Sequence, residues 1–104
     1  MGSLVGNMRN VKVFVLYLME NINYPLDFIT LNDIVMQNDY VMYLDFAEGF
    51  NQMLDTGLIE KIEFEDQECY IPTDKGRHVA RELKGDILSS ILDQSLACAL
   101  RYLD

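Results

Sequence analysis

The first segment with a regular hydrophobic pattern runs from Asn10 to about Ile22. Apolar residues recur there every three or four positions, which is the spacing of one helical face. That face consists of Val11, Phe14, Val15, Leu18 and Ile22. Other apolar residues fall on the remaining faces, and a helix that is apolar nearly all round is buried on more than one side. In a chain this short, the second covering surface predicts a partner chain.

Two further helices are predicted in the first half of the chain. Residues 26–29 could form a short strand after the first helix. Thr30 or Asn32 is expected to cap a second helix over residues 30–37. A third helix is predicted over residues 40–56. Its expected inward face consists of Tyr43, Ala47, Phe50 and Leu54.

A β-hairpin is predicted after the third helix. Gly57 stands where a left-handed helix cap is needed. Ile62 and Phe64 then alternate with charged residues, as in a half-buried strand. A turn is expected at residues 66–68, and the returning strand ends at Pro72, which lacks the N–H for a further ladder bond.

Two helices complete the chain. Thr73 can cap a helix that runs to Lys84, and Gly85 interrupts the helical pattern. The last helix is predicted from Asp86 to the C-terminus. Its apolar stripe consists of Leu88, Ile91, Leu92, Leu96, Ala99 and Leu103.

The order of these elements predicts a mainly α fold with a small β-hairpin, namely a winged helix-turn-helix with an extra C-terminal helix. We expect a disordered lead or an expression scar at residues 1–9. The winged-helix domain then covers residues 10–85, and residues 86–104 form a C-terminal dimerisation helix.

The apolar stripe of the last helix is longer than the rest of a small core can cover. A two-fold dimer would bury this stripe together with the apolar excess of the first helix. The alternative is a helix that is covered entirely within one chain. The dimer hypothesis places at the interface Phe14, Leu18, Leu88, Leu92, Leu96 and Leu103.

The composition is that of one folded domain. A chain of 104 residues has room for one core, and 50% of its residues are hydrophobic. Cys69 and Cys98 lie far apart without metal-ligand spacing, so both are expected to be free, buried thiols of a reducing cytoplasm. No apolar run approaches the roughly 18 residues of a membrane span, so no membrane contact is expected.

The sequence offers little for catalysis. His78 is the only histidine, and it is expected on the exposed side of its helix. The chain shows no catalytic triad, glycine-rich phosphate loop or metal-ligand spacing. We therefore expect that the protein is not an enzyme and uses no metal or cofactor.

The net charge of −9 is concentrated in the middle of the chain. Residues 39–68 hold nine acids and one base, Lys61, which gives a local charge of −8. Proteins that bind DNA place Lys and Arg on its phosphates. The acidity of the third helix and the hairpin therefore disfavours DNA binding.

If the third helix does contact DNA, its outer face presents Tyr40, Asp45, Glu48 and Gln52. The tip of the wing consists of Glu65, Asp66, Gln67 and Glu68. Phosphate contacts could come from Lys61, Lys75, Arg77, Arg81 and Lys84.

Several of these segments also carry a family resemblance: Val15–Leu18, Leu31–Val35, Asn38–Tyr40, Phe50–Ile59 and Thr73–Arg77. Through them the chain resembles a domain-of-unknown-function family of winged-helix proteins from clostridia and their relatives. That family is distantly similar to PadR-like and MarR-like transcriptional regulators. The resemblance implies a dimeric regulator that binds DNA, and the acidic third helix and wing depart from the regulators' pattern.

Two functions stay open at this point. The first is a homodimeric protein of the transcriptional-regulator type, with DNA contact through the third helix and the wing. The second is an interaction module whose acidic wing binds a basic protein partner. A small-molecule sensor at the dimer seam is a third hypothesis, and it rests only on the apolar excess of the first and last helices.

Overall fold

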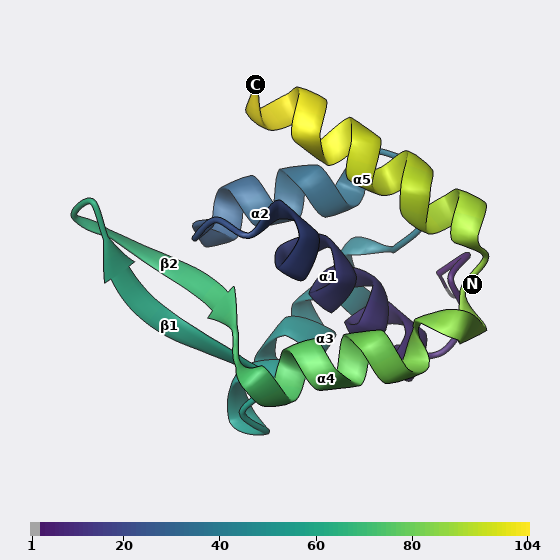
Figure 1. Ribbon diagram of the computed structural model, residues 1–104, viewed down its shortest axis with the longest axis horizontal. Coiled ribbons are helices and arrows are strands. Elements are labelled where there is room, and N and C mark those ends of the chain that lie inside the picture. Colours follow the sequence, from purple (N-terminus) through teal and green to yellow (C-terminus); the bar gives the residue numbers. More distant parts are fainter. Residues whose placement is uncertain (1–2) are drawn as a thin grey trace.

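Five α-helices and one antiparallel hairpin form the fold in the computed structural model, which describes residues 3–104 (Figure 1). Their order confirms the predicted mainly α, winged-helix arrangement with a C-terminal helix. The elements are α1 (Met8–Ile22), α2 (Phe28–Met36), α3 (Tyr43–Asp55), β1 (Ile59–Phe64), β2 (Gln67–Pro72), α4 (Asp74–Leu83), the short 3-10 helix η1 (Lys84–Asp86) and α5 (Ser89–Leu103).

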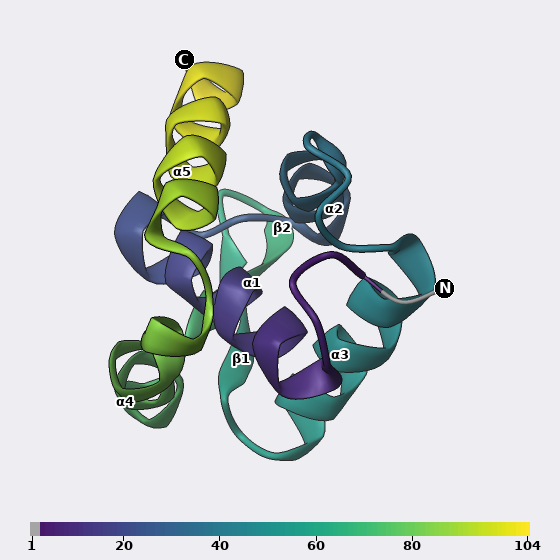
Figure 2. The ribbon, with the colours of Figure 1, turned by 90° about the vertical axis from the view of Figure 1, so that its right-hand side faces the viewer.

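Helix α1 is the centre of the molecule. Figure 2 shows it surrounded by α2, α3, α4 and α5, and it contacts α3, α4 and α5. Phe14 and Leu18 are 1% and 0% exposed, so their side chains are already covered within one chain. The prediction that these two residues face a partner is therefore wrong. The all-round apolar pattern of α1 reflects its central position.

Residues 3–9 differ from the expected disordered lead, while residues 1–2 lie outside the described residues. Ser3 and Val5 are buried, and the Val5 N–H donates to the Tyr40 carbonyl at 3.2 Å. The Asn7 side chain caps α1 by accepting from the Asn10 N–H at 2.9 Å. The polar groups of this segment are thus paired with the start of α1 and with the turn before α3.

Helix α2 begins two residues before the predicted cap. Asp27 is the cap, and its carboxylate accepts from the Thr30 N–H at 3.4 Å. Because the helix starts at once, the expected strand at residues 26–29 is reduced to one bridging residue, Leu26. Leu26 pairs with Tyr70 of β2, whose N–H donates to the Leu26 carbonyl at 2.8 Å.

Helix α3 is rotated by about one residue from the predicted orientation. Its buried residues are Phe46, Gly49, Phe50 and Met53. Phe50 was expected inside, but Tyr43 is 51% exposed, and Ala47 and Leu54 are only half-buried.

Aromatic packing explains this rotation. Phe46, Phe50 and Phe28 of α2 form a cluster with ring centroids 4.9–5.8 Å apart. The ring of Phe50 also lies 4.8 Å from that of Tyr70. Phenylalanine buries far more apolar area than alanine, so the orientation that places Phe46 inside is favoured over the one that buries Ala47.

The hairpin, or wing, has a two-residue turn. Phe64 pairs with Gln67, and the turn residues Glu65 and Asp66 have φ angles of 51° and 64°. The predicted turn at residues 66–68 is thus one residue late, and Gln67 and Glu68 belong to β2.

After the wing, α4 begins where it was predicted, whereas α5 begins later than predicted. Thr73 caps α4 and accepts from the Gly76 N–H at 3.1 Å. Helix α5 begins at Ser89 rather than at Asp86, because residues 84–86 form η1 and the buried Ile87 follows in an extended conformation.

Candidate functional site

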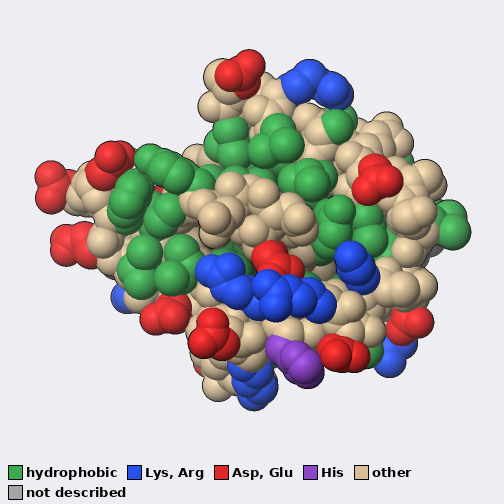
Figure 3. Space-filling model, viewed as in Figure 1, with side chains coloured by type: hydrophobic (Ala, Val, Ile, Leu, Met, Phe, Trp, Pro, Cys, Tyr) green, Lys and Arg blue, Asp and Glu red, His purple; other side chains and the backbone are tan. Residues whose placement is uncertain are grey.

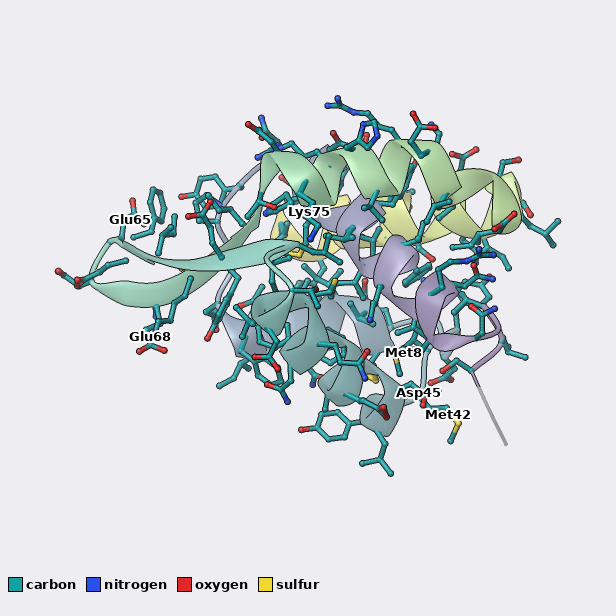
Figure 4. All side chains as sticks on the ribbon, turned by 90° about the horizontal axis from the view of Figure 1, so that it is seen from below. Met8, Met42, Asp45, Glu65, Glu68 and Lys75 are labelled. Atoms are coloured by element: carbon teal, nitrogen blue, oxygen red, sulfur yellow. The ribbon has the colours of Figure 1, made fainter. Side chains whose placement is uncertain are left out.

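The outer side of α3 and the wing lie on one side of the molecule, which Figure 4 shows from below. Met42 and Asp45 mark the start of α3, while Glu65 and Glu68 mark the far end of the wing. No Lys or Arg occurs within α3. This side therefore combines the acidic wing with a helix that has no positive charge.

The four predicted recognition residues do not form one row. The Tyr40 hydroxyl donates to Gln94 of α5 at 3.0 Å, so its ring is directed away from the outer face of α3. Asp45 accepts from the Ser3 hydroxyl at 2.5 Å. Gln52 donates to Glu48 at 3.2 Å. The structure thus brings Glu48 and Gln52 together, and their mutual bond occupies the amide that could contact a base.

An exposed apolar group at the start of α3 was missed by the sequence analysis. We call it the apolar tip, and it consists of Leu4, Met42, Tyr43 and Leu44, which are 74%, 47%, 51% and 77% exposed. The Ser3 hydroxyl accepts from the Met42 N–H at 2.9 Å, which fixes the lead beside the start of α3. Four consecutive large apolar residues, Val41 to Leu44, were the available signal, since they cannot all face inward at the start of one helix.

Lys61 in the wing and Lys75 at the start of α4, next to the wing, already have partners. The Lys61 ammonium lies 3.8 Å from a carboxylate oxygen of Glu68. The Lys75 ammonium donates to the Thr56 carbonyl at the end of α3, at 2.9 Å. The predicted wing residues, Glu65 to Glu68, are all exposed.

Of the remaining predicted phosphate contacts, Arg77 and Arg81 lie on α4 and Lys84 lies at the start of η1. Figure 3 shows Lys and Arg side chains gathered over α4. Arg81 forms an ion pair with Glu20 of α1 at 2.5 Å, and the Lys84 ammonium lies 6.0 Å from the centre of the Tyr17 ring. His78 is on the exposed side of α4, as expected, and its ring lies 3.9 Å from Glu82.

The predicted dimer residues divide into two groups. Leu92 is 4% exposed and lies in the core with Phe14 and Leu18, so the prediction that it faces a partner is also wrong. Leu96 is half-buried, while Leu88 and Leu103 are 70% and 39% exposed. The buried residues of this set cannot contact a partner, because α5 packs its Leu92 face against α1 of the same chain.

An apolar groove lies between the C-terminal ends of α1 and α5. It has a volume of about 380 Å³ and is lined by Ile22, Tyr24, Leu100 and Leu103. The Tyr24 ring also packs edge-on against Phe64 of the wing, with centroids 5.3 Å apart. Figure 3 shows hydrophobic side chains over the wing and over α5 on this face. Of the groove residues, the sequence predicted Leu103 as an interface residue and Ile22 only as part of the apolar face of the first helix.

Cysteine chemistry does not define a site. Cys69 and Cys98 are both free thiols, the first buried and the second half-buried. Burial, assisted by the nearby carboxylates of Asp27 and Glu65, raises the pKa of the Cys69 thiol above its ordinary value. Within residues 3–104, no group of three or more His, Cys, Asp or Glu residues could hold a metal ion. The same residues include no helix that is long and apolar enough to cross a membrane.

The fold places the chain in the class of winged-helix proteins. Residues 11–101 match the family model described as domain of unknown function (DUF4364), and the chain belongs to this family. Searches of curated proteins and of solved structures find no significant match.

Proposed function

We propose that this chain is a homodimeric winged-helix protein of the transcriptional-regulator type, and that its α3 and wing surface contacts a basic protein partner in place of the DNA backbone. The role is one of binding and not of catalysis. One observation carries the proposal: α3 has no Lys or Arg, and the neighbouring Lys61 and Lys75 are engaged by Glu68 and the Thr56 carbonyl.

The physical reason lies in the charge of DNA. Affinity for DNA comes largely from Lys and Arg groups that neutralise phosphates and release counterions. The wing tip instead presents Glu65, Asp66 and Glu68. These carboxylates repel phosphates that lie within a Debye length, which is about 10 Å at 0.1 M salt. The same charges accelerate the encounter with a basic protein surface.

DNA contact through α4 is the second candidate function. Arg77 and Arg81 of this helix form a basic row with Lys84 at the start of η1, and the resemblance to PadR-like and MarR-like regulators favours a DNA ligand. The ion pair between Arg81 and Glu20 reduces the charge that the row offers to phosphates. For this reason we rank DNA contact through α4 second.

A salt series of binding to random duplex DNA, measured by fluorescence anisotropy, separates these candidates. We expect no detectable binding of the wild type at about 0.15 M salt. A charge-reversed wing with Glu63→Lys, Gln67→Lys and Glu68→Lys changes the charge of residues 39–68 by +5, from −8 to −3, and should create measurable binding. Glu65 and Asp66 are left in place so that the two-residue turn, where both have positive φ angles, is not altered.

Two controls make the result decisive. The variant with Glu63→Gln and Glu68→Gln removes repulsion without adding a cation, and we expect it to remain without detectable DNA binding. Wild-type binding at micromolar concentration with a steep salt slope would contradict the proposal. If Arg77→Gln with Lys84→Gln then abolished that binding, α4 would be the contact surface.

A further inference from the structure

We infer that the apolar tip is a docking site for a short amphipathic segment of a partner protein, which carries apolar side chains on one face and Lys or Arg beside them. This inference rests on the proposed function, because it names the class of partner for the same α3 surface. It follows from the exposure, the rigidity and the charge of the residues around the tip.

The exposure of the tip is high and local. Leu44 and Leu4 are the most exposed large hydrophobic residues within residues 3–104, at 77% and 74%. Met42 and Tyr43 directly precede Leu44 in the chain and are about half exposed, and Leu4 follows Ser3, whose hydroxyl accepts from the Met42 N–H. Scattered apolar residues are common on protein surfaces, whereas several that adjoin one another mark interaction sites.

The tip is held in place by the fold. The Ser3 hydroxyl bonds both to the Met42 N–H and to the Asp45 carboxylate, and the Val5 N–H bonds to the Tyr40 carbonyl. The following turn of α3 is anchored by Phe46, which is 0% exposed. A partner would therefore bind a surface whose backbone is already ordered, and the entropy lost on binding is reduced.

The charge around the tip determines the partner. Asp39, Asp45 and Glu48 adjoin the tip in the chain, and Asp39 and Glu48 are exposed. Lys12 of α1 lies close to α3, and its side-chain stem packs at Gly49. Carboxylates at the rim of an apolar surface favour a partner that carries cations beside its apolar residues, and they disfavour acidic segments and phosphate.

The same charges disfavour a second copy of the chain at this site. A two-fold contact places the same patch of both subunits face to face. Such a contact at the tip would bring Asp39 and Glu48 of each subunit close to the same acids of the other, in a chain of net charge −9. The apolar groove between α1 and α5 does not have this disadvantage, because its lining residues are uncharged.

The test uses the full chain and a defined probe. The probe is a synthetic 14-residue peptide of Leu and Lys whose pattern forms an amphipathic helix, and its control is a peptide of the same composition with a scrambled order. Binding is mapped by chemical shifts of the ¹⁵N-labelled protein, and affinity is measured by titration. Leu44→Ser removes the most exposed side chain of the tip. Leu88→Ser is the matched control, because Leu88 is 70% exposed and lies outside the tip, at the N-cap of α5.

We expect the shift changes to be confined to residues 4, 42–44 and 48. Leu44→Ser should weaken binding about tenfold or more, since it removes most of a leucine side chain that the bound peptide would cover. Glu48→Gln should weaken binding about two- to fivefold, as for an exposed ion pair. Leu88→Ser should bind like the wild type, and the scrambled peptide should bind at least about tenfold more weakly.

Two results would overturn the inference. If Leu44→Ser bound the peptide as tightly as the wild type, with shift changes spread over the wing, the binding would come from the overall negative charge and not from the tip. If the chemical shifts of residues 42–44 changed with protein concentration in the absence of peptide, the tip would bind a second copy of the chain instead. The proposed function fails on a different readout, namely binding of random DNA by the wild type, so the two failures are distinguishable.

Discussion

The hydroxyl of Ser3 caps α3 in place of Met42. Met42 occupies the N-cap position, and its side chain makes no capping hydrogen bond. The Ser3 oxygen accepts from the Met42 N–H at 2.9 Å and donates to Asp45, in the first turn of α3, at 2.5 Å. The segment before α1 therefore stabilises the start of a helix that lies about 40 positions later in the chain.

Ser3→Ala should lower the free energy of unfolding by about 0.5–2 kcal/mol, which is the usual range for loss of a helix cap. Urea denaturation measures this change, and amide hydrogen exchange should show faster opening at residues 42–46. Ser89→Ala is the matched control, because Ser89 is exposed at the start of α5, and it should change stability by less than about 0.5 kcal/mol. Equal effects of both variants would contradict the capping role of Ser3.

The orientation of α3 gives a second prediction. Phe46→Ala should cost about 3–5 kcal/mol, because Phe46 is 0% exposed and packs against Phe28 and Phe50. Tyr43→Ala should change stability by less than about 1 kcal/mol, because its ring is 51% exposed. Denaturant midpoints of the two variants provide the measurement. The reverse order of the two effects would support the orientation that the sequence pattern predicted.

The comparison of these two residues shows what sequence patterns can and cannot fix. Spacing, glycine and capping residues located the five α-helices and both strands to within a few residues, because those signals are local, but the cap of α2 and the start of α5 were misplaced. The rotation of α3 depends on Phe28 of another helix and Tyr70 of the wing, which no local pattern reveals. A rotation by one residue turns a helix through about 100°, which keeps Phe50 inside but moves Tyr43 from the expected inner face to the surface.

The charge of the candidate site could be predicted from the sequence, whereas the contacts of its side chains could not. The acidity of residues 39–68 follows directly from the sequence. The bonds that turn Tyr40 towards Gln94 and pair Asp45 with Ser3 join residues 54 and 42 positions apart. Such pairings arise from the tertiary packing, so they could not be derived from spacing along the chain.

A third prediction concerns Gly76, which belongs to the Thr73-to-Arg77 segment that links the wing to α4. A Cβ atom at Gly76 would lie 2.0 Å from the Leu58 carbonyl oxygen, a backbone atom that also accepts from the Thr73 N–H. Gly76→Ala should therefore cost about 3 kcal/mol or more, since the backbone must shift. At Gly85 nothing lies within 4 Å of a Cβ, so Gly85→Ala should be neutral or slightly stabilising. Thermal unfolding of both variants tests this difference.

The last prediction concerns the proposed homodimer, for which the exposed apolar residues at the ends of α1 and α5 offer a surface. Leu100 is 49% exposed and Leu103 is 39% exposed, and both line the groove with Ile22 and Tyr24. If this face forms the interface, Leu100→Glu with Leu103→Glu should convert a dimer into a folded monomer, because neither side chain is needed in the core. Leu92→Glu is the contrasting variant: Leu92 is 4% exposed, so a carboxylate there should unfold the chain.

Light scattering with circular dichroism separates these outcomes. We expect the wild type to have twice the chain mass of 12.0 kDa. The double variant should have a mass near 12.0 kDa, and its helical circular dichroism spectrum should be unchanged. Wild-type protein near 12.0 kDa at micromolar concentration would rule out the dimer. A double variant that stays dimeric and folded would move the interface away from the groove, to the exposed Leu88 end of α5 or to the apolar tip.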